Sequence, residues 1–227
     1  DGGICVDEAP DGYIIGGGLY CSGNQQRGLA KLDIDGDIVW RKTYANTGAG
    51  AIRGIDITRD GEIVATGYTD SPQAGFVFIA DEAKGFIMKT DVDGNMLWDK
   101  SLCAPQGTKV REVSGGYVVC STVWLNDGED HQNVCLITTD RQGNELWSKN
   151  WGGRGNDQCF DFDLTSDGGY ILAGHTLSYG VRNWDYLLLK VDGKGDEQWH
   201  RTFGQPRGYD ARYIHDECYG VRQTPDC

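Results

Sequence analysis

The chain has 227 residues, of which 39% are hydrophobic and 24% charged, so it can bury a core and is predicted to fold. Its 34 acidic and 21 basic residues give a formal net charge of −13, which excludes nucleic acid as a partner because phosphate binding needs a basic surface. No apolar run is long enough for a membrane-spanning helix, so membrane insertion is not expected.

A strand-turn-strand pattern recurs four times along the chain. Each copy places Asp-Gly or Gly-Gly, which supply the positive φ of a tight turn, between residues that favour strands. The copies are APDGYIIGGG at 9–18, TRDGEIVATG at 58–67, VSGGYVVCST at 113–122 and TSDGGYILAG at 165–174.

A second element, Asp-x-x-Gly-x-x-x-Trp, follows each copy, so the unit repeats every fifty residues or so. Its four occurrences are Asp33/Gly36/Trp40, Asp91/Gly94/Trp98, Asp140/Gly143/Trp147 and Asp192/Gly195/Trp199. Each unit is expected to hold four strands, which in the second unit span approximately 53–57, 62–69, 85–90 and 95–102. No segment shows the apolar period of a helix.

Four-stranded units with a fixed tryptophan and no helices predict a β-propeller, and a β-sandwich is the alternative. We expect an all-β fold of four complete blades plus the first strand of a fifth in one propeller domain or fragment. The expected blades are 3–45, 51–103, 109–151, 156–204 and the partial 209–227.

The spacing of the second element also predicts a role for each residue. Asp should cap a hairpin turn through its side chain, and Gly should take the left-handed position of that turn. The Trp ring should then fill the gap between adjacent blades, with its indole N–H bonded to a backbone acceptor.

Between Asp167 and Trp199 the chain resembles secreted bacterial and archaeal repeat propellers, whose blades carry DGGYILAG followed by LLLKVDGKGDEQW. The Asp-x-x-Gly-x-x-x-Trp element also resembles the tryptophan-docking motif of quinoprotein-like propellers. The resemblance covers nearly the whole chain and implies the fold. It implies no activity, since such folds host scaffolds, binding modules and enzymes alike, and it transfers no catalytic residue.

The end of the sequence suggests an incomplete blade. Thr224, Pro225 and Asp226 align with the start of the fourth strand-turn-strand copy, so one strand of a fifth blade would be present. An unpaired edge is usually avoided in proteins. We therefore expect a larger propeller of about six to eight blades, completed by further sequence or by another chain. A closed small propeller is the alternative.

Eight cysteines without a CxxC pair indicate disulfides in an oxidising compartment, and hence an extracellular or cell-surface location. Cys120 and Cys135 lie on two expected strands joined by a polar loop, so they are the candidate disulfide. The alternative is a pair of buried free thiols.

Metal and cofactor signals are weak. The turns at 33–37 and 91–95 place oxygens at alternate positions, as calcium loops do, but they lack the bidentate Glu of an EF-hand. Capped hairpin turns explain them better, so no cofactor is expected. Calcium is the alternative. The four histidines lack the spacing of a zinc site.

A binding face is expected where the variable loops of the blades gather. It would hold the loops at 70–84, 125–132 and 177–184 and the connections near 48, 106, 153 and 208. Aromatic rings beside charged groups suit a sugar or a peptide, although the rings could equally cover blade edges. The candidate binding residues are Trp124, Asp127, Asp130, His131, Tyr179, Arg182, Trp184 and Asp185.

These observations favour a non-catalytic extracellular propeller that acts as a scaffold or protein-binding module. Its partner would be another protein, or the remainder of the propeller, at the open blade edge. The alternative is a lectin-like or polysaccharide-processing propeller that binds glycan on the variable loops. A quinone-dependent oxidoreductase ranks last, because no adjacent cysteines are present.

Overall fold

The computed structural model describes residues 2–21, 23–72, 82–126, 130–179, 184–204, 216 and 218–225. The side chains at 126 and 130 are not described. Within these ranges the regular secondary structure is entirely β-strand, as the sequence predicts. No helix in the described part of the chain is long and apolar enough to cross a membrane.

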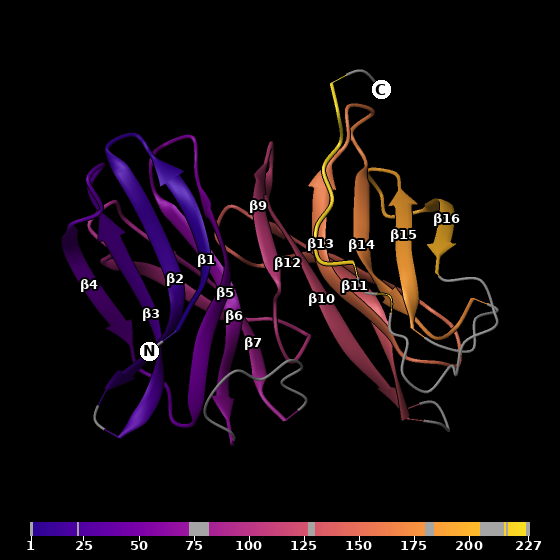
Figure 1. The fold of residues 1–227 in the computed structure, drawn as a ribbon, viewed down its shortest axis with the longest axis horizontal. Helices are drawn as coiled ribbons and strands as arrows, with labels where there is room; N and C mark the ends of the chain where they lie inside the picture. Colours follow the sequence, from indigo (N-terminus) through magenta and orange to yellow (C-terminus); the bar gives the residue numbers. More distant parts are fainter. Residues whose placement is uncertain are drawn as a thin grey trace. The chain divides into compact units, whose positions relative to one another are not determined.

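Within the described ranges sixteen strands form four antiparallel sheets of four strands each (Figure 1), which confirms the predicted four-stranded units. In every sheet the strands are neighbours in chain order. The first sheet contains β1 (Gly2–Ala9), β2 (Gly12–Cys21), β3 (Asn24–Leu32) and β4 (Ile38–Tyr44). The second contains β5 (Ala49–Ile57), β6 (Ile63–Ser71), β7 (Lys84–Thr90) and β8 (Met96–Ser101). The third contains β9 (Lys109–Val113), β10 (Gly116–Asn126), β11 (Asp130–Asp140) and β12 (Glu145–Trp151). The fourth contains β13 (Asp157–Leu164), β14 (Tyr170–Thr176), β15 (Asp185–Val191) and β16 (Glu197–Phe203).

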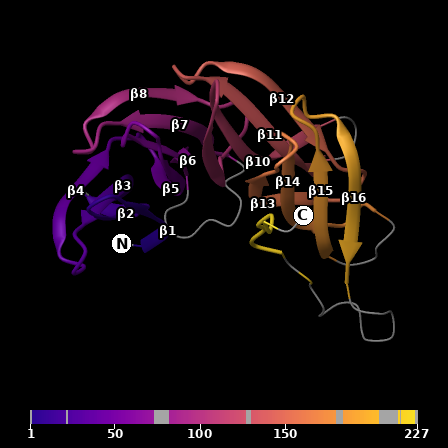
Figure 2. The same cartoon turned by 90° about the horizontal axis from the view of Figure 1, so that it is seen from above.

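The chain divides into two compact units. One unit comprises Asp1–Val119 and Ile137–Trp147, and the other comprises Cys120–Leu136 and Ser148–Cys227. In the first unit β5 packs against β1, β2 and β3 (Figure 2), so the second sheet lies on the first. Their shared core consists of Ile14, Leu29, Tyr44, Ile52, Ile55, Ile63, Ala65, Phe86 and Met88.

The second unit has its own buried apolar strands. In β14 all seven residues are buried, and β15 buries Leu187 and its last three residues. Phe162 of β13 lies edge-on to Tyr170 of β14, with ring centroids 6.4 Å apart. β14 is therefore buried on both faces, whereas β16, at the outer edge of the same sheet, is mostly exposed.

A glycine on the second strand of three sheets lets the first strand approach closely. Added Cβ atoms at Gly17, Gly67 and Gly174 would collide with the carbonyl oxygens of Gly2, Ala51 and Gln158 respectively. In all three sheets the first strand has a register shift beside this glycine. A glycine permits this backbone contact because it has no side chain. This packing explains the glycine that ends the second and fourth strand-turn-strand copies and the next-to-last glycine of the first copy.

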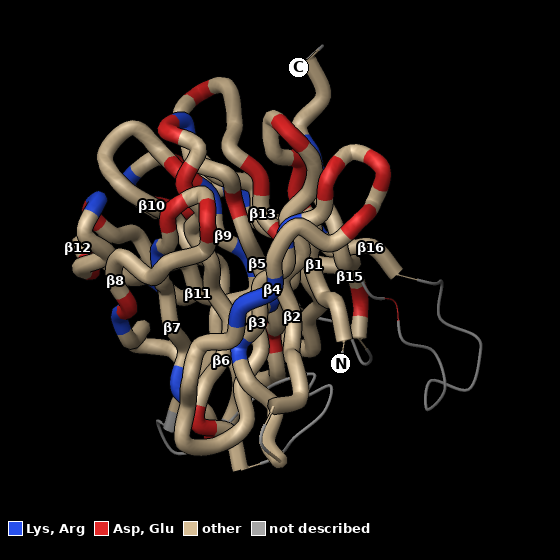
Figure 3. The backbone as a smooth tube through the Cα atoms, turned by 90° about the vertical axis from the view of Figure 1, so that its left-hand side faces the viewer, with Lys and Arg blue, Asp and Glu red and all other residues tan. Residues whose placement is uncertain are grey.

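The hairpin turn between the third and fourth strands is the same in all four sheets. The Asp that opens it accepts hydrogen bonds through Oδ1 from the backbone N–H groups two and four residues later, over 2.7 to 3.0 Å. The turn glycine has a positive φ between 74° and 87°. Acidic residues, red in Figure 3, recur in such turns. The capping Asp residues are Asp33, Asp91, Asp140 and Asp192.

The capped turns give the fold a defined response to acid. Hydrogen bonds from Asn144 lower the pKa of Asp140 below its ordinary value of 3.8. A carboxylate with a depressed folded-state pKa stabilises the fold above its ordinary pKa, and this contribution is lost as the pH falls below 3.8. We expect Asp140→Asn to lower the unfolding temperature at pH 6 and to reduce its decline between pH 5 and pH 2. Thermal unfolding followed by circular dichroism measures both effects.

Asp35→Asn is the control for this experiment. It removes an exposed carboxylate from the first turn and leaves the capping Asp33 in place. An identical pH dependence in Asp140→Asn and the parent would contradict the role of the cap.

Candidate functional site

The repeated tryptophan packs on the turn of the following sheet. Trp40 lies against the core shared by the first and second sheets, and a Cβ added to Gly94 would come within 2.9 Å of its ring. A Cβ added to Gly143 would come within 2.6 Å of the Trp98 ring. Gly94 and Gly143 thus each have two roles, since the positive φ makes the turn and the missing side chain admits an indole. In these two cases the ring fills the space between sheets.

Side chains two and four residues after the tryptophan complete this contact. Lys42 Nζ donates to Asn95 Oδ1 at 2.5 Å, and the Tyr44 hydroxyl donates to the Gly94 carbonyl at 2.8 Å. Lys149 makes the corresponding ion pair with Asp196 at 2.7 Å. A base two residues after Trp therefore meets the polar residue that follows the next turn glycine. We call the Trp, the base and the residue four after Trp the outer docking face.

A second contact recurs between the first strands of neighbouring sheets. Asp7 Oδ2 accepts the backbone N–H of Ile57 at 3.2 Å, and Asp56 Oδ2 accepts that of Glu112 at 2.7 Å. A second hydrogen bond runs in the opposite direction, since Glu112 Oε2 accepts the backbone N–H of Arg59 at 2.8 Å. Asp7 and Asp56 stand two residues before their strand-turn-strand copies. We call this arrangement the inner clasp.

The last described residues form the same clasp with the fourth sheet. Asp163 Oδ2 accepts the backbone N–H of Gln223 at 3.0 Å, and Gln223 Oε1 accepts that of Ser166 at 2.6 Å. Asp161 adds hydrogen bonds from Val221 N–H and the Arg222 guanidinium. Residues 218–225, yellow beside β13 in Figure 1, have no assigned strand, yet they hold the position of the first strand of a following sheet.

The outer docking face of the fourth sheet is exposed. Trp199 is 40% exposed and Phe203 51%, whereas Tyr44, the counterpart of Phe203, is 6% exposed. The Arg201 guanidinium lies 5.9 Å from the Trp199 ring centroid of its own strand and donates to the His200 carbonyl. Burial of all four tryptophan rings was expected, and for Trp199 that expectation is wrong. Residues 218–225 form the inner clasp with β13, but no described turn covers the Trp199 ring.

The structure also corrects the expected bonding of the indole groups. Among the described residues, none accepts a hydrogen bond from the buried Trp40 Nε1. The ring is placed by apolar packing on glycine, and no carbonyl faces its N–H. Trp147 is half-buried, and its backbone carbonyl accepts the Thr138 hydroxyl at 3.3 Å.

The first sheet presents the complementary surface. Gly36 has a φ of 87°, as the other turn glycines do, yet a Cβ placed on it would meet nothing within 4 Å. Gly36 is exposed, whereas Gly94, Gly143 and Gly195 are buried. Asp37 follows Gly36 and is also exposed. No tryptophan occupies this turn in the described part of the chain.

The predicted loop-face residues fall into several environments. Asp127 and Arg182 lie outside the described residues, as do 73–81 of the expected loop at 70–84. Asp130 begins β11, His131 is buried, and Asp185 begins β15 half-buried. Trp124 on β10 is 41% exposed. The predicted set is therefore partly exposed and partly in the interior.

Two of the predicted aromatic residues stack on histidines. Trp184 lies edge-on to His175, with ring centroids 4.3 Å apart, and Tyr179 lies 4.1 Å from His200. Burial raises the pKa of Tyr179 to about 12, so its hydroxyl stays protonated at neutral pH. These rings support one another as packing elements. Trp124 is the predicted aromatic residue with the largest exposed surface.

A polar network lies beneath these rings. His175 Nε2 shares a hydrogen bond with Gln158 Oε1 at 2.5 Å, and Gln158 donates onward to Gln132 at 2.5 Å. Asp157 Oδ2 accepts the Ser178 hydroxyl at 2.5 Å and the backbone N–H of Gly153 at 3.0 Å. Buried polar groups bonded in this way hold loop ends rigid, because breaking one bond leaves its partner unsatisfied.

The predicted disulfide is not formed in this structure. Cys120 on β10 and Cys135 on β11 are both buried and both thiols, and no two of the described cysteines are joined. Cys120 instead hydrogen-bonds with Cys159 of β13, and burial together with this contact raises the pKa of Cys159. The alternative of buried thiols describes this arrangement.

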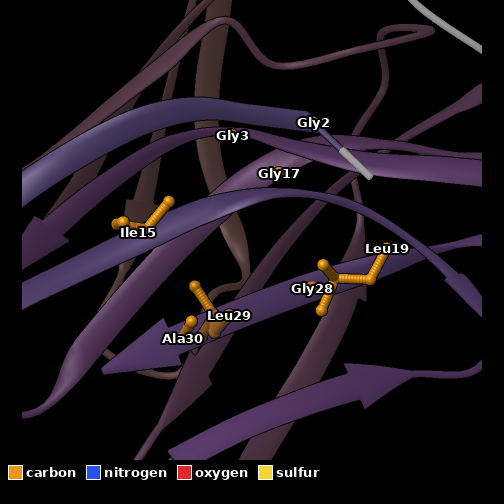
Figure 4. A pocket seen from close by; sticks show the side chains of 8 residues that line it. All are labelled: Gly2, Gly3, Ile15, Gly17, Leu19, Gly28, Leu29 and Ala30. Carbon is orange, nitrogen blue, oxygen red and sulfur yellow. The ribbon is translucent and has the colours of Figure 1, made fainter. Parts of the chain in front are cut away.

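The described residues contain no group of three or more His, Cys, Asp and Glu side chains that could hold a metal ion. A pocket of about 140 Å³ lies over the first sheet (Figure 4), lined by Gly2, Gly3, Ile15, Gly17, Leu19, Gly28, Leu29 and Ala30. None of these eight residues has a polar side chain, so the pocket is mainly apolar and any polar contact with a ligand would come from the backbone.

Two repeated functional features were absent from the sequence predictions. One is the base two residues after each tryptophan, present as Lys42, Lys100, Lys149 and Arg201. The other is the Asp two residues before three of the strand-turn-strand copies, present as Asp7, Asp56 and Asp163. Extending the alignment of the repeats by a few residues on each side would have revealed both.

Comparisons with known proteins assign no family. No protein-family model matches the chain, and no curated protein matches it. A Bacteroides caccae protein of unknown function aligns with a TM-score of 0.45 and 14% identity over 85% of this chain and 78% of its own. Sqt1 from Chaetomium thermophilum aligns with a TM-score of 0.42 and 12% identity over 85% of this chain. A eukaryotic initiation factor aligns with a TM-score of 0.41 and 11% identity over 88% of this chain. The chain spans 46% of Sqt1 and 55% of the initiation factor.

The docking of Trp98 on Gly143 predicts unequal effects of one substitution at two turns. Gly143→Ala adds backbone strain at positive φ and a methyl group 2.6 Å from the indole, so we expect a loss of about 2–5 kcal/mol of unfolding free energy. Gly36→Ala adds the strain alone, which costs about 1–2 kcal/mol. Denaturant unfolding of both variants measures the difference.

Gly36→Ala is the matched control, since both glycines have a similar φ. Equal destabilisation of the two variants would show that the tryptophan contact contributes nothing to stability.

Proposed function

We propose that this chain is a non-catalytic extracellular β-propeller, or part of one, that acts as a scaffold or protein-binding module through the open side of its fourth sheet. The observation that carries the proposal is the exposure of Trp199 and Phe203 on a face whose counterpart in the first sheet is covered. A partner protein, or further blades of the same propeller, would occupy this face.

The inner clasp supports this proposal. Gln223 already bonds with Asp163 as Glu112 bonds with Asp56, so the inner part of the next blade position is filled. The outer part, beside β16, is lined by side chains that elsewhere in this protein are covered. Burying one large apolar side chain contributes about 1.5–3 kcal/mol, so covering both rings is a substantial driving force for association.

An extracellular location is supported by the composition. Eight cysteines are many for a chain of this length in a reducing compartment, and the acidic surface favours solubility. The described cysteines are thiols, so the support for an extracellular location comes from the composition and not from an observed disulfide.

Native mass spectrometry combined with cross-linking of protein isolated from its source tests the proposal. We expect a stable protein complex whose cross-links map to β16, and a Trp199→Ala form that binds its partner at least about tenfold more weakly. A complex that cross-links elsewhere, or a form that stays a single chain with Trp199 exposed, would count against it.

Glycan binding is the second candidate, and the exposure of Trp124 favours it. An exposed aromatic ring at the end of a strand can stack on a sugar, and Trp124 is 41% exposed beside the predicted loops. A glycan array would then show binding that Trp124→Ala abolishes and that Trp199→Ala leaves intact. An array without signal would remove this candidate.

A further inference from the structure

The exposed face of the fourth sheet has a complement within this same chain. Trp199, Arg201 and Phe203 repeat the spacing of Trp40, Lys42 and Tyr44. The group that covers Trp40 is a turn with an Asp cap, a glycine of positive φ and a polar residue directly after it. Any partner that is to cover Trp199 in the same way must present such a turn.

The turn at 33–37 has these properties and is vacant. Asp33 caps it through the same two backbone hydrogen bonds as Asp91 makes, and Gly36 has an open space where a Cβ would stand. Asp37 occupies the position of Asn95, the acceptor of the Lys42 ammonium. A carboxylate at this position binds the Arg201 guanidinium more strongly than an amide would, since both partners of the hydrogen bond are then charged.

We propose that the outer docking face of the fourth sheet binds the turn at 33–37 of a second copy of this chain. Trp199 packs on Gly36 of the second copy, and Arg201 pairs with its Asp37. This inference rests on the proposed function and names the partner as the protein itself. Opposite charges on the two surfaces favour the pairing and make it sensitive to salt.

The inner strand position is compatible with this contact. Val221 and Pro225 repeat Val6 and Pro10 in the same register relative to the strand-turn-strand copies. In the second copy β1 has mostly exposed side chains, with Val6 66% exposed. The residues around Val221 hold this position beside β13, so they detach when β1 of the second copy, which stays paired with its own β2, enters it.

A contact between different surfaces has a consequence for assembly. After one contact each pair of copies keeps one unused turn and one unused face, so the contact continues into rings, of which a ring of two copies is the smallest, or into open chains. The mass of the protein in solution should therefore grow with concentration from that of one copy to that of two copies or more.

Analytical ultracentrifugation of the purified full chain over a range of micromolar concentrations tests the proposal. We expect concentration-dependent growth for the parent, and monomers for Trp199→Ala and for Asp37→Arg. Trp124→Ala is the matched control, since Trp124 is 41% exposed and Trp199 40%, and it should associate as the parent does. Circular dichroism verifies that each variant is folded.

Mixing the two monomeric variants gives the sharpest readout. Trp199→Ala keeps an intact turn, and Asp37→Arg keeps an intact docking face, so together they should form a one-to-one complex and nothing larger. Combining Arg201→Asp with Asp37→Arg in one chain reverses both charges and should restore association. A parent that stays monomeric, or a mixture without a complex, would overturn the proposal.

The outcomes separate this inference from the proposed function. A monomeric recombinant chain, together with a native complex cross-linked at β16, would reject self-association and retain the protein-binding function. Loss of association in Trp124→Ala but not in Trp199→Ala would reject the docking face and point to the loop end of β10.

Discussion

The arrangement of neighbouring sheets depends on the contact between an indole ring and a turn that has no side chain. The turn glycine must adopt a positive φ for the chain to reverse, and only a residue without Cβ does so at little cost. The same absence leaves room for a tryptophan from the preceding sheet, as Gly94 does for Trp40. One residue type therefore satisfies two demands at Gly94 and Gly143, whereas Gly36 satisfies the first alone.

Two sets of contacts hold the seam between sheets at opposite ends. The outer docking face joins the fourth strand of one sheet to the turn of the next, and the inner clasp joins the first strands. The outer contact is mainly apolar, and the inner one consists of carboxylates that accept backbone N–H groups, as Asp56 does from Glu112. Burial raises the pKa of Asp56, and the Glu112 N–H and the Arg111 guanidinium oppose that shift. Apolar packing supplies contact area, and the directional hydrogen bonds set the register.

The fold was predictable from the sequence because each repeated residue has a local physical role. Asp-Gly turns and alternating β-branched residues specify hairpins through short-range geometry, so the four-stranded units could be found by pattern alone. The Asp cap and the positive φ of Gly36, Gly94, Gly143 and Gly195 also follow from local turn chemistry. The start of β5 at Ala49 rather than near Arg53 was less accessible, since strand ends depend on pairing with distant residues.

The candidate site was harder to predict, because burial depends on the residues across a seam. Trp199 ends the same repeated Asp-x-x-Gly-x-x-x-Trp element as Trp40, but a turn glycine of the next sheet packs on the Trp40 ring and none of the described turns packs on Trp199. His131 belongs to a polar loop in the sequence but is buried. The predicted Cys120–Cys135 disulfide considered only two neighbouring strands. The contact that forms joins Cys120 to Cys159 on β13, a strand far along the chain that the local sequence does not place beside β10.

The inner clasp gives the last residues a role that their lack of regular structure would not suggest. Residues 218–225 have no assigned strand, yet Val221 and Gln223 bond through their main chain to β13. Such a segment shields the edge of the first strand with only a few hydrogen bonds, so it can detach at a low free-energy cost while the sheet beneath it stays intact. Amide protons of Val221 and Gln223 would then exchange with solvent much faster than those of β14, and proteases would trim this end without unfolding the protein.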